Sequence, residues 1–332
     1  MSADVTGDEG SLKKGSLVVV FGGSGFAGRH VVQVLARRGY RVRVAVRRPN
    51  AAHFLRPMGD VGQVQPVQAN IRDERSVKLA LNGADAVINL VGLLHEAGAQ
   101  RFDAVHLVGA ARVARLAAAA GVRHFIQVSA IGADHDSPSD YGRSKAAGED
   151  AVLKAIPSAT IVRPSIMFGP EDDFFNRFAA LARISPVLPL LGGGHTKFQP
   201  VYVQDVAEAI ARLLVKPEAA GKVYELGGRE TYSFRELMEL VLRETGRKCA
   251  LVPMPFILAK INAFFLQFLP NPPLTPDQVS LLKADNVVSG EAEKAGLTLA
   301  GLGIEATAPE AVLPTYLYRF RRTGQFEDRF AG

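Results

Sequence analysis

Three side chains near the middle of the chain have the types and the spacing needed for proton transfer. Tyr141 and Lys145 are four residues apart, so on a helix they share one face. An ammonium group beside a phenol favours the phenolate, which makes Tyr141 a candidate general acid or base. Ser129 precedes Tyr141 by twelve residues and is a candidate for holding a substrate carbonyl. A Tyr and a Lys at this spacing are common by chance, but their order after Ser129 and a glycine-rich motif is not.

A glycine-rich stretch near the start of the chain predicts a phosphate-binding turn. Residues 17–28 read LVVVFGGSGFAG, an apolar β-branched run followed by glycines and then by an amphipathic segment. Strand, glycine turn and helix in this order are typical of a dinucleotide site, because the amides at the helix start face the phosphates. Two registers fit, Gly23-x-Gly25-x-x-Gly28 and Gly22-x-x-Gly25-x-x-Gly28. The alternative is an ordinary turn between a strand and a helix.

The end of the second predicted strand indicates which nicotinamide cofactor this turn would hold. An Asp or Glu about 20 residues past the glycines would accept a hydrogen bond from the ribose of NAD. The sequence has no acid there and has Arg47 and Arg48, whose planar guanidinium groups suit a 2′-phosphate. Arg29, directly after the glycines, is a further candidate. We therefore expect NADP(H), and the alternative is two surface arginines at a strand end.

Two further strand ends carry candidate cofactor contacts. Asn70 and Ile71 follow the third predicted strand, where an adenine contact would fall, and the amide of Asn70 can donate and accept at a base edge. Asp73 is at least as well suited to capping the next helix. Val91 and Gly92 end the fourth predicted strand, where a glycine lets the chain run close beside a dinucleotide. A plain turn explains that glycine equally well.

A doubly wound α/β sheet would bring these residues together. Residues 16–165 alternate strand and helix patterns, and the carboxyl ends of parallel strands meet at one crevice. The helical patterns cover residues 102–120 and 141–155. The predicted strands are 17–21, 41–46, 64–68, 86–90, 124–129 and 160–163. We expect a Rossmann-type parallel sheet followed by a smaller, mostly helical C-terminal cap.

The pattern loosens after Pro164, which indicates a second lobe. We predict a tail over residues 1–14, a nucleotide-binding domain over 15–230, with 166–199 partly cap, and a cap lobe over 231–332. Residues 199–215 are expected to return to the sheet and continue as a helix. Ser233 and Glu236 form a capping box that opens another helix. The acidic triplet 171–173 is expected to be a solvated loop.

The run from Pro253 to Leu269 (PMPFILAKINAFFLQFL) carries a single charge, Lys260. Its apolar residues recur at helical spacing, which predicts a helix that docks on a partner or lies at a membrane interface. The alternative is a helix that covers the core of the cap itself. No segment approaches the roughly 20 apolar residues needed to span a bilayer.

Composition narrows the class of protein. The chain has 332 residues, of which 48% are hydrophobic and 22% charged, as is ordinary for a globular protein. The single cysteine, Cys249, excludes an internal disulfide and suggests a reducing compartment. The net charge of +6 is mixed along most of the chain, which suits an anionic cofactor, an acidic partner or a phospholipid surface and gives no sign of a nucleic-acid-binding tail. The scattered histidines predict no metal site. The first fourteen residues resemble neither a secretory signal nor a mitochondrial presequence, so we expect a cytoplasmic or already processed chain.

The order of GGSGFAG, VSA and YGRSKAAGE resembles the atypical or extended branch of the short-chain dehydrogenase/reductase superfamily. Three later stretches narrow the resemblance: IVRPSIMFGPEDDFFNRF, QPVYVQDVAEAI and GLGIEATAPE. From residue 16 to residue 322 the chain is similar to the family of NADPH-binding accessory subunits of respiratory complex I and their bacterial relatives. The resemblance implies that NADPH is held mainly structurally, on the matrix or cytoplasmic arm of complex I near the membrane.

The resemblance also implies roles for single residues. The nicotinamide end of the cofactor would meet Lys145, Pro164 and Ser165. Mitochondrial members tend to have an eroded catalytic set, whereas this chain keeps Ser129, Tyr141 and Lys145. An NADPH-dependent oxidoreductase acting on a carbonyl, lipid-like or quinone-like substrate is therefore the alternative function. The residues expected to contact the cofactor are Gly22, Gly23, Ser24, Gly25, Phe26, Gly28, Arg47, Arg48, Asn70, Ile71, Val91, Gly92, Lys145, Pro164 and Ser165.

Overall fold

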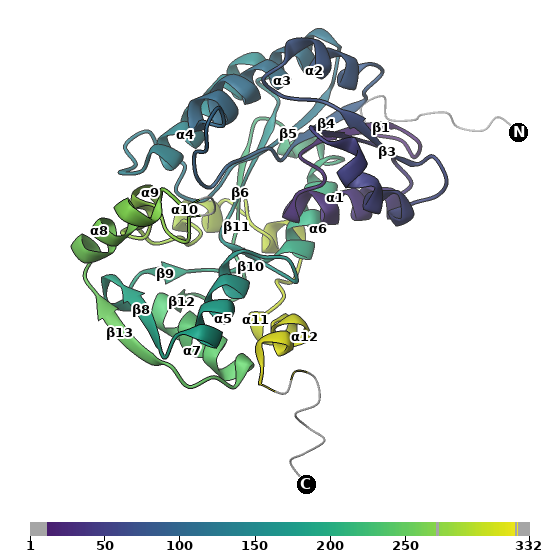
Figure 1. The fold of residues 1–332 in the computed structure, drawn as a ribbon. Coiled ribbons are helices and arrows are strands. Elements are labelled where there is room, and N and C mark those ends of the chain that lie inside the picture. The colour runs from purple at the N-terminus through teal and green to yellow at the C-terminus, as the bar shows by residue number, and fades with distance from the viewer. Residues whose placement is uncertain (1–11, 270–271, 323, 325–332) are drawn as a thin grey trace, which may run out of the picture.

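The computed structural model describes residues 12–269, 272–322 and 324, and its centre is a seven-stranded sheet (Figure 1). The strand order is β11-β6-β5-β4-β1-β2-β3, and every neighbouring pair is parallel. The strands are β1 Leu17–Phe21, β2 Arg41–Val46, β3 Val64–Gln68, β4 Ala86–Asn89, β5 His124–Val128, β6 Thr160–Pro164 and β11 Val223–Leu226. The predicted doubly wound fold is confirmed, and three of the predicted strands end one residue away from the observed position.

Helices cover both faces of the sheet (Figure 1). A separate hydrophobic core lies between the sheet and the helices of each face. On one face α1 (Phe26–Arg37) packs against α6 (Val203–Leu213). On the other lie α2 (Glu74–Leu81), α3 (Val108–Ala119) and α4 (Asp140–Ala155), with one turn of π-helix, η2 (Asp103–Leu107), before α3. The strand order changes direction between β1 and β4, so the carboxyl ends of these two strands border the crevice in which this type of sheet binds ligands.

The return of the chain to the main sheet occurs later than the sequence predicts. Within residues 199–215, β10 (Val201–Tyr202) pairs with β7 (Met167–Phe168) in a separate ladder, and α6 follows it directly. The position beside β6 is taken by β11, which the sequence analysis missed. The expected return was therefore wrong. The two residues of β10 pair with β7, whereas the four residues of β11 pair with β6 of the main sheet.

A third core holds the second lobe together. It lies between α5 (Phe174–Ile184), α7 (Phe234–Thr245), the ladder of β8 (Val187–Leu191) with β13 (Ala250–Met254), and α12 (Pro314–Leu317). The predicted capping box at the start of α7 is confirmed, because the amide of Glu236 donates to Ser233 Oγ at 3.2 Å and that of Ser233 donates to Glu236 Oε2 at 2.7 Å.

The acidic triplet is a loop in which the side chains of Glu171 and Asp173 are exposed, as predicted, and that of Asp172 is not. Asp172 is buried and accepts hydrogen bonds from the amide of Phe175 at 2.6 Å and from the hydroxyl of Tyr316. These bonds tie the loop before α5 to α12 and satisfy a carboxylate that would otherwise be costly to bury.

Two of the hydrophobic cores contain residues from both sides of the predicted boundary between residues 230 and 231. The third core combines residues from 166–199 with residues from 231 onward. Leu299, Leu302 and Ile304 join instead the core of α1 and α6. Leu12 is buried in that same core, and residues 1–11 of the predicted tail lie outside the described residues. The boundary between 230 and 231 stays a prediction.

Helix α8 (Phe256–Leu266) turns its small residues inward and most of its large ones outward. Ala259 and Ala263 are fully buried, and Phe256 packs against the third core. Ile257, Phe264, Phe265 and Phe268 are 76%, 53%, 68% and 74% exposed. These exposed side chains therefore do not cover the lobe's own core. Among the described residues, no helix combines the length and the apolar composition that crossing a membrane requires.

Candidate nucleotide site

The glycines between β1 and α1 are packed too closely to carry side chains. Gly22 has a φ of +78°, and a Cβ there would lie 3.2 Å from the backbone nitrogen of Val91. A Cβ on Gly23 would lie 2.7 Å from Val44 Cγ1, and a Cβ on Gly28 would collide with the carbonyl oxygen of Gly22. The turn is thus a cradle whose surface is backbone.

Helix α1 begins in this cradle without a side-chain cap. Its N-cap is Gly25, which has no side chain to accept hydrogen bonds from the first-turn amides, and no acid lies in that turn. The amide of Gly25 donates to the carbonyl of Gly22 at 3.0 Å and closes the turn. This geometry favours the register Gly22-x-x-Gly25-x-x-Gly28. A helix start of this kind offers amides to an anion, so the cradle fits a pyrophosphate.

Basic side chains lie beside the cradle at the end of β2. Arg47 and Arg48 are exposed and form no ion pair within the described residues. Arg29, on α1, has its guanidinium carbon 5.0 Å from the centre of the Phe54 ring and pairs with Glu171 at 3.2 Å. Its buried Nε has no partner among the described residues. The structure therefore keeps positive charge available where the sequence predicts the 2′-phosphate.

The predicted contacts that follow β3 differ in the polar groups that they can offer to a ligand. The side-chain oxygen of Asn70 accepts from the amide of Arg72 at 3.1 Å. Ile71 has its side chain in the core, and its carbonyl accepts from Arg112 at 2.7 Å. Asp73 caps α2 by accepting from the amide of Arg75 at 3.2 Å, which confirms its alternative role.

Helix α4 presents Tyr141 and Lys145 beside the ends of β4 and β5. Lys145 is buried, donates to the carbonyl of Val128 at 3.4 Å, and has Nζ 5.8 Å from the centre of the Tyr141 ring. Nζ also lies 3.3 Å from where a Cβ on Gly92 would be, so a side chain there would crowd the ammonium. Ser129, just after β5, is 5% exposed, and its Oγ has no partner within the described residues. An unpartnered buried hydroxyl is a site where a ligand oxygen can bond.

The charge states of this pair differ from the simplest expectation. Burial raises the pKa of Tyr141 well above its usual value, and the negative charge of Asp277 raises it further. Burial lowers the pKa of Lys145 to about 8, against the opposing effect of Glu149. In the protein alone the phenol is therefore neutral, because the cost of burying a charged phenol dominates, and the expected effect of Lys145 on the phenolate stays a prediction.

His106 is a further buried group of the site, which the sequence analysis missed. It is 3% exposed; Nε2 accepts from the amide of Leu93 at 2.9 Å, and Nδ1 lies 2.9 Å from Ser144 Oγ. Its ring stacks on Phe102 and meets Tyr141 edge-on, with 5.4 Å between centroids in both pairs. Burial, and then the charge of Lys145, lower the pKa of His106 to about 3, so the ring is neutral at physiological pH. Nothing in the local sequence distinguishes it from the other histidines.

The Pro164–Ser165 segment is held by Asn286 of the second lobe. Ser165 Oγ donates to Asn286 Oδ1 at 2.7 Å, and the amide of Ile166 donates to the same oxygen at 3.0 Å. Pro164 offers its carbonyl to the amide of Ile131 at 3.0 Å. These predicted contacts are thus fixed in place by bonds within the protein.

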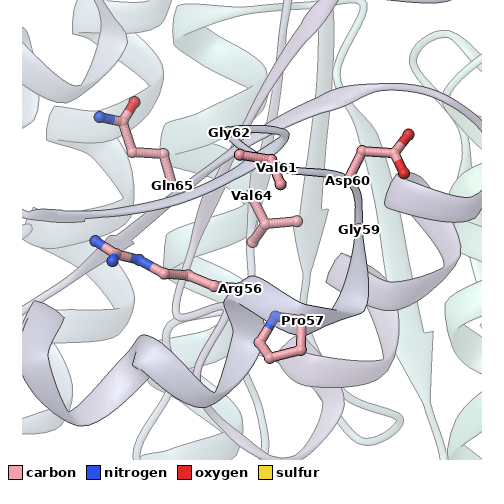
Figure 2. A pocket seen from close by; sticks show the side chains of 8 residues that line it. All are labelled: Arg56, Pro57, Gly59, Asp60, Val61, Gly62, Val64 and Gln65. Atoms are coloured by element: carbon pink, nitrogen blue, oxygen red, sulfur yellow. The ribbon is translucent and has the colours of Figure 1, made fainter.

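One open pocket lies away from the strand ends that carry these residues. Figure 2 shows it between the end of η1 (Pro49–Met58) and the turn that leads into β3, with a volume of about 550 Å³. It is lined by Arg56, Pro57, Gly59, Asp60, Val61, Gly62, Val64 and Gln65. Because it adjoins the amino end of β3, it lies opposite the crevice. Within the described residues, no cluster of His, Cys, Asp or Glu is arranged to hold a metal ion.

The fold and the glycine cradle define a Rossmann-type dinucleotide-binding protein with a second lobe. The chain belongs to the NAD dependent epimerase/dehydratase family, whose model matches residues 18–227. The family membership supports a nicotinamide dinucleotide as the cofactor.

Curated relatives match the chain over most of its length. The mitochondrial NADH dehydrogenase (ubiquinone) 1 alpha subcomplex subunit 9 of Arabidopsis thaliana is 42% identical, and the alignment covers 87% of this chain and 75% of the relative. The protein of the same name from Dictyostelium discoideum is 34% identical, with 96% and 88% covered. The ceramide reductase of Caulobacter vibrioides is 36% identical, with 72% and 74% covered. The family resemblance seen in the sequence is confirmed.

Solved structures share the fold at low identity. The dTDP-glucose 4,6-dehydratase DesIV of Streptomyces venezuelae has a TM-score of 0.68 and 22% identity, with 94% of this chain and 99% of that chain covered. UDP-glucose 4-epimerase of Thermotoga maritima has a TM-score of 0.67 and 19% identity, with 92% and 99% covered. These likenesses show the fold alone.

Proposed function

We propose that the protein is an NADPH-binding accessory subunit associated with respiratory complex I, and that the nucleotide is held mainly as a structural cofactor. The observation that carries the proposal is the alignment with NADH dehydrogenase alpha subcomplex subunits over nine-tenths of the chain or close to it. The glycine cradle supports it, because the lack of a side chain at Gly28 lets α1 pack against the carbonyl of Gly22, so that the first amides of the helix lie at the turn where a pyrophosphate would bind. The proposed location is the inner face of the bacterial inner membrane, or the matrix side if the chain is mitochondrial.

The choice of NADPH rests on the adenosine end of the crevice. Arg47 and Arg48 are unpaired within the described residues, and no acid stands at the end of β2 to bind a free 2′-hydroxyl. Arg29 supplies a third guanidinium close by, on α1. Bidentate pairing with guanidinium groups is a strong form of phosphate recognition.

A structural role is supported by the bonds that the nicotinamide end makes within the protein. Ser165 Oγ donates to Asn286 Oδ1 at 2.7 Å, and His106 Nε2 accepts from the amide of Leu93 at 2.9 Å. A ligand that binds only the folded chain stabilises it by mass action, so the apoprotein should melt at a lower temperature.

The exposed face of α8 is the proposed contact with the membrane surface. Phe264, Phe265 and Phe268 are exposed next to one another, with ring centroids 5.6 and 5.8 Å apart in the two pairs that include Phe264. Lys260 lies in the same surface, where it can pair with a lipid phosphate. The burial of such a face in the acyl boundary would hold the protein at the membrane without a spanning helix.

A second candidate function is an NADPH-dependent oxidoreductase with a lipid-like carbonyl substrate. It is favoured by the unpartnered Ser129 hydroxyl beside the Tyr141–Lys145 pair, and by the similarity to a protein named ceramide reductase. Bound NADPH would supply the hydride. Ser129 would hold the carbonyl oxygen, Tyr141 would donate a proton to it, and Lys145 would orient the nucleotide and favour the resulting phenolate.

Two measurements test the proposal. The protein is purified without added cofactor and denatured, and the released nucleotide is identified; we expect NADP(H). Membranes from the native host are then separated on a native gel, where we expect co-migration with complex I. A chain that releases no nucleotide, or that runs only as a free monomer or dimer, contradicts the corresponding half of the proposal. Tyr141→Phe separates the two functions, since loss of a measured NADPH oxidation rate supports the enzyme.

A further inference from the structure

One carboxylate of the second lobe reaches the first turn of α4. Asp277 lies in the first turn of α9 (Pro276–Leu281), well over a hundred residues along the chain from α4. Its side chain accepts three hydrogen bonds: from Ser139 Oγ at 2.9 Å, from the amide of Asp140 at 2.7 Å and from the amide of Tyr141 at 3.2 Å. Figure 1 shows α9 against the start of α4, in agreement with the contacts between these helices.

The position of Asp277 is itself fixed. Thr275 and Gln278 form a capping box: the amide of Gln278 donates to Thr275 Oγ1 at 3.2 Å, and Gln278 Oε1 accepts from the amide of Thr275 at 3.1 Å. Pro276 occupies the first position of the helix, where its fixed φ suits the turn. The carboxylate is therefore presented by a rigid turn, and its negative charge lies at the positive end of the α4 dipole.

A second side chain of the same lobe reaches the other side of the crevice. Asn286 accepts from Ser165 and Ile166 through Oδ1, and its Nδ2 donates to the carbonyl of Ile131 at 3.2 Å. Helix α8 packs on α9, so the exposed apolar face of α8 and the contacts of Asp277 belong to one packed unit. A shift of this unit would move the side of the nicotinamide end that α4 forms.

We infer that Asp277 is a positioning residue, which ties α8 and α9 to the first turn of α4 and so fixes Tyr141 and Lys145 at the nicotinamide end of the crevice. The inference rests on the proposed nucleotide site, because the pair has a ligand to meet only there. By linkage, a nucleotide bound against the pair stabilises α9. If the nucleotide changes the affinity of α8 for a partner by some factor, that partner changes the affinity for the nucleotide by the same factor.

The first test is hydrogen exchange on the full chain without nucleotide, with Asp277→Asn compared with Asp140→Asn. Asp140 is the matched control, because its carboxylate stands in the same turn of α4 and pairs on the surface with Arg143. We expect the amides of residues 140–142 to exchange at least about tenfold faster in Asp277→Asn, as opening of the turn becomes easier. Exchange in Asp140→Asn should stay at the wild-type rate.

A second readout follows the phenol ring directly. The tyrosines are replaced by 3-fluorotyrosine, and the Tyr141 fluorine resonance is assigned with Tyr141→Phe. We expect this resonance to shift and broaden in Asp277→Asn and to stay unchanged in Asp140→Asn. An unchanged resonance and unchanged exchange in Asp277→Asn, or equal changes in both variants, overturn the inference even if both variants fold normally.

NADPH then tests the linkage. We expect saturating NADPH to slow exchange in residues 276–281 of the wild type and to have no effect there in Asp277→Asn. A wild type that NADPH stabilises against heat without slowing exchange in α9 contradicts the linkage. If NADPH leaves the melting temperature unchanged, the proposed function fails, whereas the role of Asp277 is still decided by the exchange and fluorine results.

Discussion

The two ends of the crevice are built in opposite ways. At the adenosine end, Arg47 and Arg48 are exposed and unpaired within the described residues, and α1 starts without a cap. At the nicotinamide end, Lys145 and His106 are buried and bonded within the protein. Arg47 and Arg48 of the adenosine end come from the first lobe, while side chains of the second lobe reach the nicotinamide end.

This difference bears on whether the protein only binds a nucleotide or also uses it as a reactant. Unpaired guanidinium groups and free amides need an anion to complete them, so the adenosine end is built for binding. The nicotinamide end holds Lys145 and His106 by bonds within the protein and leaves Ser129 Oγ without a partner among the described residues. Substitutions at the two ends should therefore have different effects.

The largest effect is expected for Gly28→Val, which attacks the adenosine end through its backbone. The new side chain would collide with the carbonyl of Gly22 and with Gly23. Overpacking against backbone should lower the free energy of unfolding by about 3 kcal/mol and abolish the rise in melting temperature on adding NADPH. Urea denaturation and thermal melts with and without NADPH measure both effects. Gly290→Ala is the control, since nothing lies within 4 Å of a Cβ there; a wild-type response of Gly28→Val to NADPH would show that the cradle does not hold the phosphates.

The next effect is a loss of selectivity in the double variant Arg47→Ala/Arg48→Ala. Losing charge-assisted hydrogen bonds to the 2′-phosphate should cost about 3 kcal/mol, or about 100-fold in NADPH affinity, with little change for NADH. Calorimetric titration with both nucleotides measures the difference. The exposed Arg56→Ala in η1 serves as the control. Equal losses for NADPH and NADH would place the two arginines away from the 2′-phosphate.

His106 should make the nicotinamide end sensitive to acid. Its pKa is about 3 in the folded protein and about 6.5 when unfolded, so the unfolded chain binds the extra proton between these values. Its contribution to stability is complete above pH 6.5 and is lost as the pH falls towards 3. Between pH 7 and pH 5 this should lower the free energy of unfolding by about 2 kcal/mol.

Urea denaturation at the two pH values measures this effect in the wild type and in His106→Gln. Glutamine can keep a donor and an acceptor but does not titrate, so the variant should lose about 2 kcal/mol less than the wild type between pH 7 and pH 5. His53→Gln, at an exposed position, should behave as the wild type does. The same pH dependence in His106→Gln and the wild type would mean that other groups cause the acid sensitivity.

The adenosine end could be predicted from the sequence because its signals are local. The run of Leu17–Phe21, the glycines after it and the arginines after β2 are each a short continuous pattern. The capping box of α7 is local in the same way. The nicotinamide end could be predicted only in part, since Tyr141 and Lys145 share a helix face but their charge states depend on burial.

The remaining features of the site depend on residues far apart in the sequence. Asp277 meets Tyr141 across 136 residues, and Asn286 meets Ser165 across 121. No spacing rule connects such pairs, because tertiary packing alone brings them together. The capping box at Thr275 was a visible signal for the start of α9, but nothing in it shows what Asp277 would contact.

The smallest effect on folding is expected for Phe264→Glu/Phe265→Glu on α8, a helix of the second lobe. Both side chains are more than half exposed, so the free energy of unfolding should change by less than about 0.5 kcal/mol and NADPH affinity should stay at the wild-type value. Membrane association should nevertheless fall, because two charges replace the apolar surface that the acyl boundary would bury. Flotation with vesicles of phosphatidylcholine and cardiolipin measures this, and Leu79→Glu, which removes an exposed leucine from α2, is the control. Full flotation of the double variant would remove α8 from the proposed membrane contact and leave the proposed nucleotide site untouched, since the glycine turn and the two arginines of the adenosine end lie on elements other than α8.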